Sequence, residues 1–356
     1  MLEHDEAPIS VLYIGGTGTI SASCVRLSVE SGMRVSVLNR GNNAKQRELP
    51  DDVERITGDV TDEAALSAAL EGRSFDAIVN FLSYDREDAE RAVRVLGPLT
   101  KQYVYISSAS VYGKPVLQTP VTESTPVHNR FLGYARAKLR AEAVMHEAYA
   151  EHGFPMTIVR PSHTYDDANP PLAGDWTVID RIARGAEVPV HGDGTSLWTL
   201  THAEDFAVGL VGLLGNPRAI GETFHITGDD VHTWDQIHRI IADALGVEAR
   251  IVHVPSDLYP VVAPDWFWSE LLVGDLAHSA VFDNTKIKRF VPSFGQRLTF
   301  HRAVRRMLAW REAHPEQTAP DPTTDAVLER IVTAYHAGRD AFAAHAPASA
   351  SAATEA

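Results

Sequence analysis

Cysteine is almost absent from this sequence. Cys24 is the only one among 356 residues, so no internal disulfide can form. No apolar run approaches the roughly 20 residues that a membrane-spanning helix needs. The acidic start, Met1 to Ser10, also lacks the cationic and apolar regions of a signal peptide. These absences predict a cytoplasmic protein with no membrane partner.

Clustered positive charge is also missing. The sequence contains no run of lysine or arginine, and its formal net charge is −15. Because proteins that bind nucleic acids usually present a basic face to the phosphates, this balance predicts no nucleic-acid partner. Nothing in the sequence indicates a metal site, and a small-molecule substrate is the expected partner.

A glycine-rich turn near the N-terminus organises the rest of the chain. The apolar run from Val11 to Ile14 is typical of a buried strand, and the glycines after it turn the chain into a helix. Gly15 permits a tight turn, and Gly18 lets the backbone approach a pyrophosphate. The amides of Thr19 and Ile20, at the N-terminus of the helix, would bind that anion. The segment predicts a dinucleotide site.

The end of the second predicted strand (33–38) bears on which dinucleotide is bound. An acidic residue normally stands there and holds the ribose hydroxyls of NAD, but here the positions are Asn39 and Arg40. The Arg40 guanidinium can pair with a 2′-phosphate, assisted by Lys45, which favours NADP over NAD. In the alternative, Arg40 is a solvated loop residue and Asn39 holds the ribose of NAD.

Short apolar segments alternate with helical ones along the first two thirds of the chain. Strands are expected at 53–57, 76–81, 103–107, 156–160 and 223–227. The alternation predicts an α/β fold, a doubly wound parallel sheet of the Rossmann type with a smaller C-terminal substrate-binding lobe. The dinucleotide-binding domain would span 1–165, completed by 203–228, and the lobe would span 166–202 and 229–320. The Ala/Ser/Pro-rich end, 341–356, is expected to be a disordered tail.

A tyrosine and a lysine share one face of a predicted helix at 131–151. Tyr134 and Lys138 are four residues apart, about one helical turn. A nearby ammonium favours the phenolate, so the pair predicts a lowered pKa for Tyr134 and a role in proton transfer. Such pairs also arise by chance on solvated helices. The glycine turn and the serines before the helix favour the chemical interpretation.

Six segments in a fixed order resemble the extended short-chain dehydrogenase/reductase family, the NAD(P)-dependent epimerase/dehydratase group. They are GGTGTIS, GDVTD, SSASVYG, YARAK, IVRPSHTY and GDGTSLWTLTHAEDFA. The resemblance runs from about residue 11 to 308. It implies that Tyr134 is the acid/base, that Ser108 hydrogen-bonds the reacting oxygen, and that Lys138 also holds the nicotinamide ribose.

The same resemblance implies further cofactor contacts and an assembly. Asp59 and Val60 would contact adenine, and the residues from Asn80 through Phe81 to Leu82 would line the cofactor. Pro161 and His163 would pass beside the nicotinamide. A homodimer through the helices around Asp88 and Tyr134 is expected at the level of the family.

Departures from the family pattern bear on the reaction and the substrate. Sugar-nucleotide 4,6-dehydratases carry an Asp-Glu pair where this chain has Ala109 and Ser110, which disfavours dehydration. Two arginines that commonly hold a nucleotide-sugar diphosphate in this family are replaced by Trp198 and Leu272. His163 replaces an asparagine.

The substrate-binding candidates are therefore Ser110, His163 and Trp198. The imidazole of His163 could contact a hydroxyl or a phosphate. A packing role, with the imidazole bonded to backbone, is the alternative. Any phosphate would be held by His163 and a nearby arginine, Arg136, Arg181 or Arg184.

These features favour a redox isomerase, an epimerase acting through a transient ketone. Its substrate would be carbohydrate-like: a sugar, a sugar phosphate, or a nucleoside or its monophosphate. The first alternative is an NADPH-dependent ketoreductase with the same catalytic residues. The second is a catalytically weak relative that binds RNA, suggested by the Asn39-Arg40-Gly41 end of the second strand.

Overall fold

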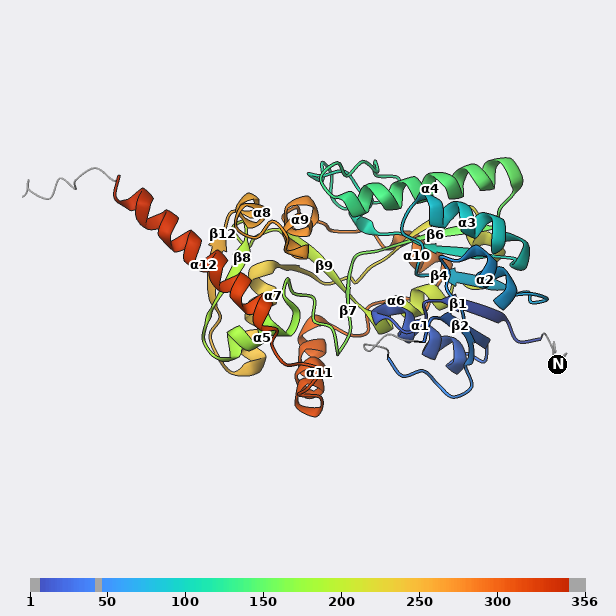
Figure 1. Cartoon of the computed structure of the whole chain (residues 1–356), viewed down its shortest axis with the longest axis horizontal. Helices are drawn as coiled ribbons and strands as arrows, with labels where there is room; N and C mark the ends of the chain where they lie inside the picture. Colours follow the sequence, from blue (N-terminus) through green and yellow to red (C-terminus); the bar gives the residue numbers. More distant parts are fainter. Residues whose placement is uncertain (1–6, 42–46, 346–356) are drawn as a thin grey trace, which may run out of the picture.

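A seven-stranded parallel sheet forms the centre of the N-terminal part of the molecule (Figure 1). The computed structural model describes residues 7–41 and 47–345. The strand order is β10-β6-β5-β4-β1-β2-β3. The strands are β1 (Ser10–Ile14), β2 (Arg34–Asn39), β3 (Glu54–Thr57), β4 (Ala77–Asn80), β5 (Tyr103–Ile106), β6 (Met156–Pro161) and β10 (Thr223–Ile226). This arrangement confirms the predicted Rossmann-like α/β class.

Both faces of the sheet are covered by helices, which explains why a central strand such as β1 is buried and apolar from Val11 to Ile14. From β1, Val11 and Tyr13 pack with residues of α1 and α6, whereas Leu12 and Ile14 pack on the opposite face with residues of α3 and α4. The helices and short 3-10 turns of this part are α1 (Thr19–Glu30), α2 (Glu63–Ala69), α3 (Arg86–Val95), η1 (Gly97–Leu99), η2 (Ala109–Val111), α4 (Gly133–His152), α6 (Ala203–Val211), η3 (Pro217–Ala219) and α10 (Thr285–Phe290).

A second lobe lies beside the sheet, on the left in Figure 1. Its apolar core includes three buried tryptophans, Trp176, Trp198 and Trp234. Two small sheets support it, β11-β9-β7 and β12-β8. The elements are β7 (His163–Tyr165), α5 (Asp175–Ala183), β8 (Glu187–His191), β9 (Leu197–His202), β11 (Val231–Thr233), α7 (Trp234–Leu245), β12 (Arg250–Val254), η4 (Ser256–Leu258), α8 (Tyr259–Val262), α9 (Phe267–Leu271), the π-helix η5 (Leu272–Leu276), α11 (Phe300–Ala313) and α12 (Pro322–Ala343).

The C-terminal helix α12 was not expected from the sequence. It packs Leu328, Ile331 and Val332 into the core of the lobe, and its far end projects from the molecule (Figure 1). The helix continues to Ala343, so it includes the first three residues, 341–343, of the predicted tail. Alanine has the highest helix propensity, so an alanine-rich composition extends a helix that packing has begun. Residues 346–356 of the predicted tail lie outside the described residues.

Candidate functional site

The glycine turn has the conformation and the clearance that a dinucleotide needs. Gly15 has a φ of +81°, which an L side chain rarely adopts, and a Cβ there would lie 2.6 Å from Leu82 Cγ. Gly18 is the N-cap of α1, and its N–H donates to Ser21 Oγ at 2.8 Å. A Cβ at Gly18 would meet only Ser21 Oγ, at 3.3 Å. The turn thus leaves the α1 N-terminus open to an anion, and its residues fit NAD(P).

The other cofactor candidates lie at the carboxyl ends of neighbouring strands, where ligands bind in such sheets. Asn39 ends β2, and its Oδ1 accepts a hydrogen bond from the Gly41 N–H at 3.0 Å. The Arg40 side chain is 67% exposed, with a guanidinium nitrogen 3.9 Å from an Asp59 carboxylate oxygen. This weak pair leaves Arg40 accessible. Lys45, the suggested assistant of Arg40, lies outside the described residues.

The segment after β4 links the glycine turn to the catalytic candidates. Asn80 ends β4, and its Oδ1 accepts from the Leu82 N–H at 2.8 Å. Leu82 lies against Gly15, while the next residue, Ser83, offers its carbonyl to Lys138 Nζ at 2.6 Å. Phe81 is packed beside Tyr13 of β1, with ring centres 6.3 Å apart. Val60, after β3, packs at the edge of the same core as Leu82.

The structure brings Ser108, Tyr134 and Lys138 together. Lys138 is 2% exposed and also donates from Nζ to the Ile106 carbonyl at 2.9 Å, and this nitrogen lies 5.7 Å from the centre of the Tyr134 ring. Ser108 lies near enough to Tyr134 to act on the pKa of its phenol. Ser110 is also part of the cluster, because its Oγ lies 2.7 Å from Ser108 Oγ. The cluster contains a proton carrier, a hydrogen-bonding hydroxyl and a cation.

Burial dominates the titration of this cluster. The Tyr134 side chain is 42% exposed, yet partial removal from water, and then the neighbouring Tyr84, raise its pKa to about 12, while Ser108 acts in the opposite direction. Burial lowers the pKa of Lys138 to about 7, against the carboxylates of Asp88 and Glu142. In this structure the pKa of Tyr134 is thus raised, whereas the sequence predicts that Lys138 lowers it.

Aromatic rings surround His163 just beyond β6, whose last residue is Pro161. The imidazole contacts Trp198, Trp234 and Trp268 edge-on, with ring centres 6.3, 6.0 and 6.1 Å away. Burial lowers the pKa of His163 to about 4, so the ring is neutral near pH 7. Its Nε2 is buried and has no hydrogen-bond partner among the described residues. A neutral ring fits a hydroxyl, and the expectation that His163 binds phosphate is not supported.

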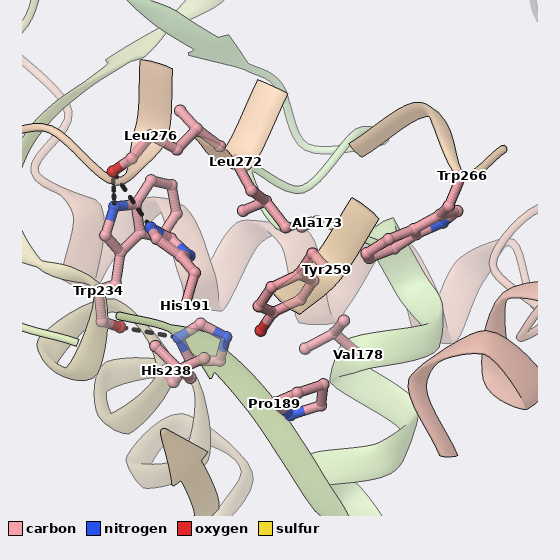
Figure 2. Close-up of a pocket in the computed structure, with 11 residues that line it drawn as sticks. Ala173, Val178, Pro189, His191, Trp234, His238, Tyr259, Trp266, Leu272 and Leu276 are labelled. Carbon is pink, nitrogen blue, oxygen red and sulfur yellow. Dashed lines mark hydrogen bonds between the residues drawn. The ribbon is translucent and has the colours of Figure 1, made fainter. Parts of the chain in front are cut away.

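Trp198 is part of the core of the lobe rather than an open wall. It is 2% exposed, and its indole N–H donates to the Leu276 carbonyl at 2.8 Å. That carbonyl, at the end of the π-helix, also accepts from Trp234 Nε1 and His191 Nε2, both at 3.1 Å (Figure 2). The N–H that the sequence seemed to offer a substrate is used inside the protein. Sequence reasoning missed Leu276, because a backbone acceptor leaves no signal in residue type.

A pocket in the C-terminal lobe adjoins His163 through Trp234 (Figure 2). Its lining is mainly apolar and aromatic, and neither arginine nor lysine is among the described residues that form it. The Tyr259 hydroxyl is buried there without a hydrogen-bond partner among the described residues. The lining residues are Ala173, Val178, Pro189, Val190, His191, Trp234, His238, Tyr259, Trp266, Leu272 and Leu276.

The arginines proposed for phosphate binding have other contacts. The Arg181 side chain is 1% exposed and pairs with Asp325 and Glu329, each at 2.6 Å. Arg184 pairs with the same Asp325 at 2.6 Å. The expectation that Arg181 or Arg184 binds a phosphate is therefore not supported. Helix α12, which the sequence did not reveal, supplies the carboxylates that pair with both guanidinium groups. Arg136 donates from Nη1 to the Arg130 carbonyl at 2.6 Å.

One buried ion pair near the cluster was also missed. Lys114 Nζ lies 2.7 Å from Asp275 Oδ1, and both side chains are buried. The same nitrogen lies 5.4 Å from the centre of a Trp198 ring. The pair joins the loop after Ser110 to the π-helix of the lobe.

Among residues 7–41 and 47–345, no group of three His, Cys, Asp or Glu side chains is arranged to hold a metal ion, and no helix is long and apolar enough to cross a membrane.

The parallel sheet with a glycine turn at its centre defines a Rossmann-type enzyme of the extended short-chain dehydrogenase/reductase class. Residues 11–227 match the model of the NAD dependent epimerase/dehydratase family, and the chain belongs to that family. The family assignment agrees with the resemblance drawn from the six sequence segments.

Three known proteins illustrate the range of this similarity. The 2′-dehydrokanamycin reductase of Streptomyces kanamyceticus is 28% identical over 300 residues, which cover 83% of each chain. The chloroplast stem-loop binding protein of 41 kDa b from Arabidopsis thaliana is 28% identical over 255 residues, 68% of this chain and 65% of the other. The solved dTDP-glucose 4,6-dehydratase of Bacillus anthracis, in complex with NAD, has a TM-score of 0.70 at 19% identity, covering 86% of this chain and 98% of that one.

Proposed function

We propose that the protein is an NAD(P)-dependent redox isomerase, an epimerase that acts on a carbohydrate-like substrate through a transient ketone. One observation supports this most: Ser108, Tyr134 and Lys138 meet at the carboxyl edge of the sheet, joined to the glycine turn through the segment after β4. This arrangement is suited to exchange between a secondary hydroxyl and a ketone.

Each residue of the cluster has a role in that exchange. Bound NAD(P) would supply the hydride-transfer chemistry at the hydroxyl-bearing carbon. Tyr134 takes the hydroxyl proton as the ketone forms and gives it back when the hydroxyl is restored. Ser108 donates a hydrogen bond to the reacting oxygen. Lys138 lies beside Tyr134, favours the phenolate when it is protonated, and would hold the nicotinamide ribose.

The cofactor would lie across the carboxyl ends of the first strands. Gly15, Gly18 and the α1 N-terminus would hold the pyrophosphate. We propose that NADP is preferred, because Arg40 is exposed at the end of β2 and only weakly paired with Asp59. The contacts proposed beyond this region are those of Asn39, Asp59, Val60, Asn80, Phe81, Leu82, Pro161 and His163.

The substrate is proposed to lack a nucleoside-diphosphate group. Trp198 and Leu272 are buried and apolar where arginines were expected, and neither can replace a bidentate guanidinium. The neutral His163 and the occupied Arg181 and Arg184 favour an unphosphorylated sugar or nucleoside over a phosphorylated one. A neutral Ala109-Ser110 pair gives no carboxylate for water elimination.

A specific similarity favours a second function, a ketoreductase that acts on a sugar-like ketone. The relative from Streptomyces kanamyceticus, named as a reductase, aligns over 83% of each chain. The same three residues would serve, with Tyr134 as proton donor to the ketone. A reductase consumes one reduced cofactor per turnover, whereas an epimerase consumes none.

A substrate panel tests both functions. Free sugars and nucleosides, their monophosphates, keto-sugars, and UDP-, GDP- and dTDP-sugars are incubated with the protein and NADP, NAD or NADPH, with products resolved by chromatography and NADPH followed at 340 nm. Epimerised products without added reductant support the isomerase. Stoichiometric NADPH oxidation with a keto-sugar supports the reductase.

Three results would contradict the proposals or test them further. Efficient turnover of a nucleoside-diphosphate sugar would overturn the proposed substrate class. Tight binding of an RNA stem-loop with no turnover would favour the RNA-binding alternative suggested by the Asn39-Arg40-Gly41 end of the second strand, against the net charge of −15. Native mass spectrometry of the same sample tests the proposed homodimer through α3 and α4.

A further inference from the structure

A buried carboxylate lies one helical turn beyond Lys138. Glu142 is 3% exposed on the same face of α4. Its Oε1 accepts from Ser107 Oγ at 2.5 Å and from Arg160 Nε at 2.9 Å, and its Oε2 accepts from Arg160 Nη2 at 2.5 Å. Both carboxylate oxygens are therefore occupied by partners from other elements.

These partners are neighbours of the candidate active-site residues. Ser107 follows β5 and directly precedes Ser108. Arg160 lies in β6 directly before Pro161. One carboxylate thus ties the ends of two strands to the helix that carries Lys138.

The network continues from the guanidinium to the edge of the sheet. Arg160 Nη1 donates to the Tyr112 hydroxyl at 2.9 Å, and that hydroxyl contacts the imidazole of His225 in β10. Burial, followed by the Arg160 charge, lowers the pKa of His225 to about 3, so this ring is neutral near pH 7. Glu123 Oε1 accepts from the His225 backbone N–H at 3.1 Å.

Stability alone is a weak explanation for such a pair. Removing two charges from water costs much of what their attraction returns, and apolar replacements of buried ion pairs are often as stable. The bidentate geometry instead fixes direction and distance, because a guanidinium and a carboxylate meet in one plane.

We propose that Glu142 is a positioning residue for the oxidoreductase reaction: it ties the segments that carry Ser108, Lys138 and Pro161 together and so holds the Lys138 ammonium beside Tyr134. The role of Glu142 in catalysis rests on the proposed function. The effect of Glu142 on Lys138 does not depend on the substrate.

Several groups face Lys138 besides Glu142. The Asp88 carboxylate on α3 favours the ammonium, as Glu142 does. The rings of Tyr84, Tyr105 and Tyr134 lie 4.8, 5.2 and 5.7 Å from Nζ. The carbonyls of Ser83 and Ile106 accept its hydrogen bonds. A change at Glu142 therefore removes one of two carboxylates that favour the charged lysine.

The test replaces the ion pair by a neutral, hydrogen-bonded pair. Glu142→Gln by itself strands the Arg160 guanidinium without its partner and can prevent folding. The double variant Glu142→Gln/Arg160→Gln removes both charges and keeps amide groups that can bond to each other and to Ser107. The matched control is Arg181→Gln/Glu329→Gln, which neutralises another ion pair of a buried arginine, in the C-terminal lobe.

Two measurements are made on proteins shown to be folded by circular dichroism. Lysine side-chain NMR, with ¹³Cε and ¹⁵Nζ labels and Lys138→Met for assignment, follows the Lys138 titration without cofactor or substrate. Turnover and NADPH affinity are then measured with the substrate that the panel identifies.

The proposal expects the Lys138 titration midpoint to fall by about half a pH unit or more in the double variant and to stay unchanged in the control. Turnover should fall at least tenfold while NADPH affinity changes less than twofold. A folded double variant with wild-type turnover and an unchanged Lys138 midpoint would overturn it. If the midpoint moves but the wild-type protein turns over no member of the panel, the proposed function fails and the link between Glu142 and Lys138 stands.

Discussion

Replacing Lys138 by methionine should change how the stability of the fold depends on pH. Burial lowers the pKa of this lysine from its ordinary 10.5 to about 7. Between these values the unfolded chain binds the proton and the folded chain does not, so the free energy of unfolding rises with pH through this window. Methionine fills a similar volume and does not titrate.

The magnitude follows from the same two values. Each pH unit between about 7 and 10.5 contributes at most about 1.4 kcal/mol, so the whole window contributes up to about 5 kcal/mol. The wild type should gain this stability relative to Lys138→Met as the pH rises. The stability of the wild type relative to Lys138→Met should be lowest at pH 7 and below, where the wild type must hold a buried ammonium.

The assay is urea unfolding followed by tryptophan fluorescence at pH 7, 8, 9 and 10. The quantity compared is the difference in free energy of unfolding between the two proteins, in which the titration of other groups cancels. Lys101→Met is the matched control, because the Lys101 side chain is 83% exposed. Its difference from the wild type should stay nearly flat. Parallel curves for wild type and Lys138→Met would refute the reasoning, since the lysine would then not titrate differently on folding.

Three further predictions concern the active site and the C-terminal helix. Tyr134→Phe should lower turnover by about 10²-fold or more with NADPH affinity unchanged, because it removes the group that moves the proton; near-normal turnover would contradict the assignment. Arg40→Ala should weaken NADP by about 1.5 kcal/mol and spare NAD, as judged by titration with both cofactors, with the small value reflecting an exposed guanidinium; equal losses for both cofactors would remove the NADP preference. Leu328→Ala should cost about 2–5 kcal/mol in chemical denaturation, whereas Phe342→Ala, at an 85% exposed side chain of the same helix, should cost almost nothing; equal effects would mean that α12 does not pack as described.

Local patterns in the sequence were enough to predict most of the strands of the sheet and the class of the fold. The strand from Val11 to Ile14 was recognisable because it is covered on both faces and is therefore apolar at every position. Helix starts also follow local rules: Thr233 caps α7 through a capping box with Gln236. The predicted ends of the sheet strands differ from the observed ones by a residue or so, because a strand's last pairing depends on its neighbours.

Features that depend on distant contacts were not recognisable. Helix α12 buries one face against a lobe that earlier segments of the chain form. Its own apolar pattern is only moderate, so the sequence did not predict it. The pairing of Arg181 with carboxylates of α12 then removed a candidate for phosphate binding. The Leu276 carbonyl, which accepts a hydrogen bond from the Trp198 indole N–H, is a buried backbone group at the end of a π-helix.

The sequence by itself determined the class of protein, the position of the dinucleotide turn and the spacing of Tyr134 and Lys138, because each depends on residues that are neighbours along the chain. The tertiary structure decided the electrostatics of the site. Burial makes His163 neutral and lowers the pKa of Lys138 to about 7, and the folded strands bring Ser107 and Arg160 to Glu142. Desolvation and ion pairing between remote segments exist only once the chain has folded, so no local pattern can encode their balance.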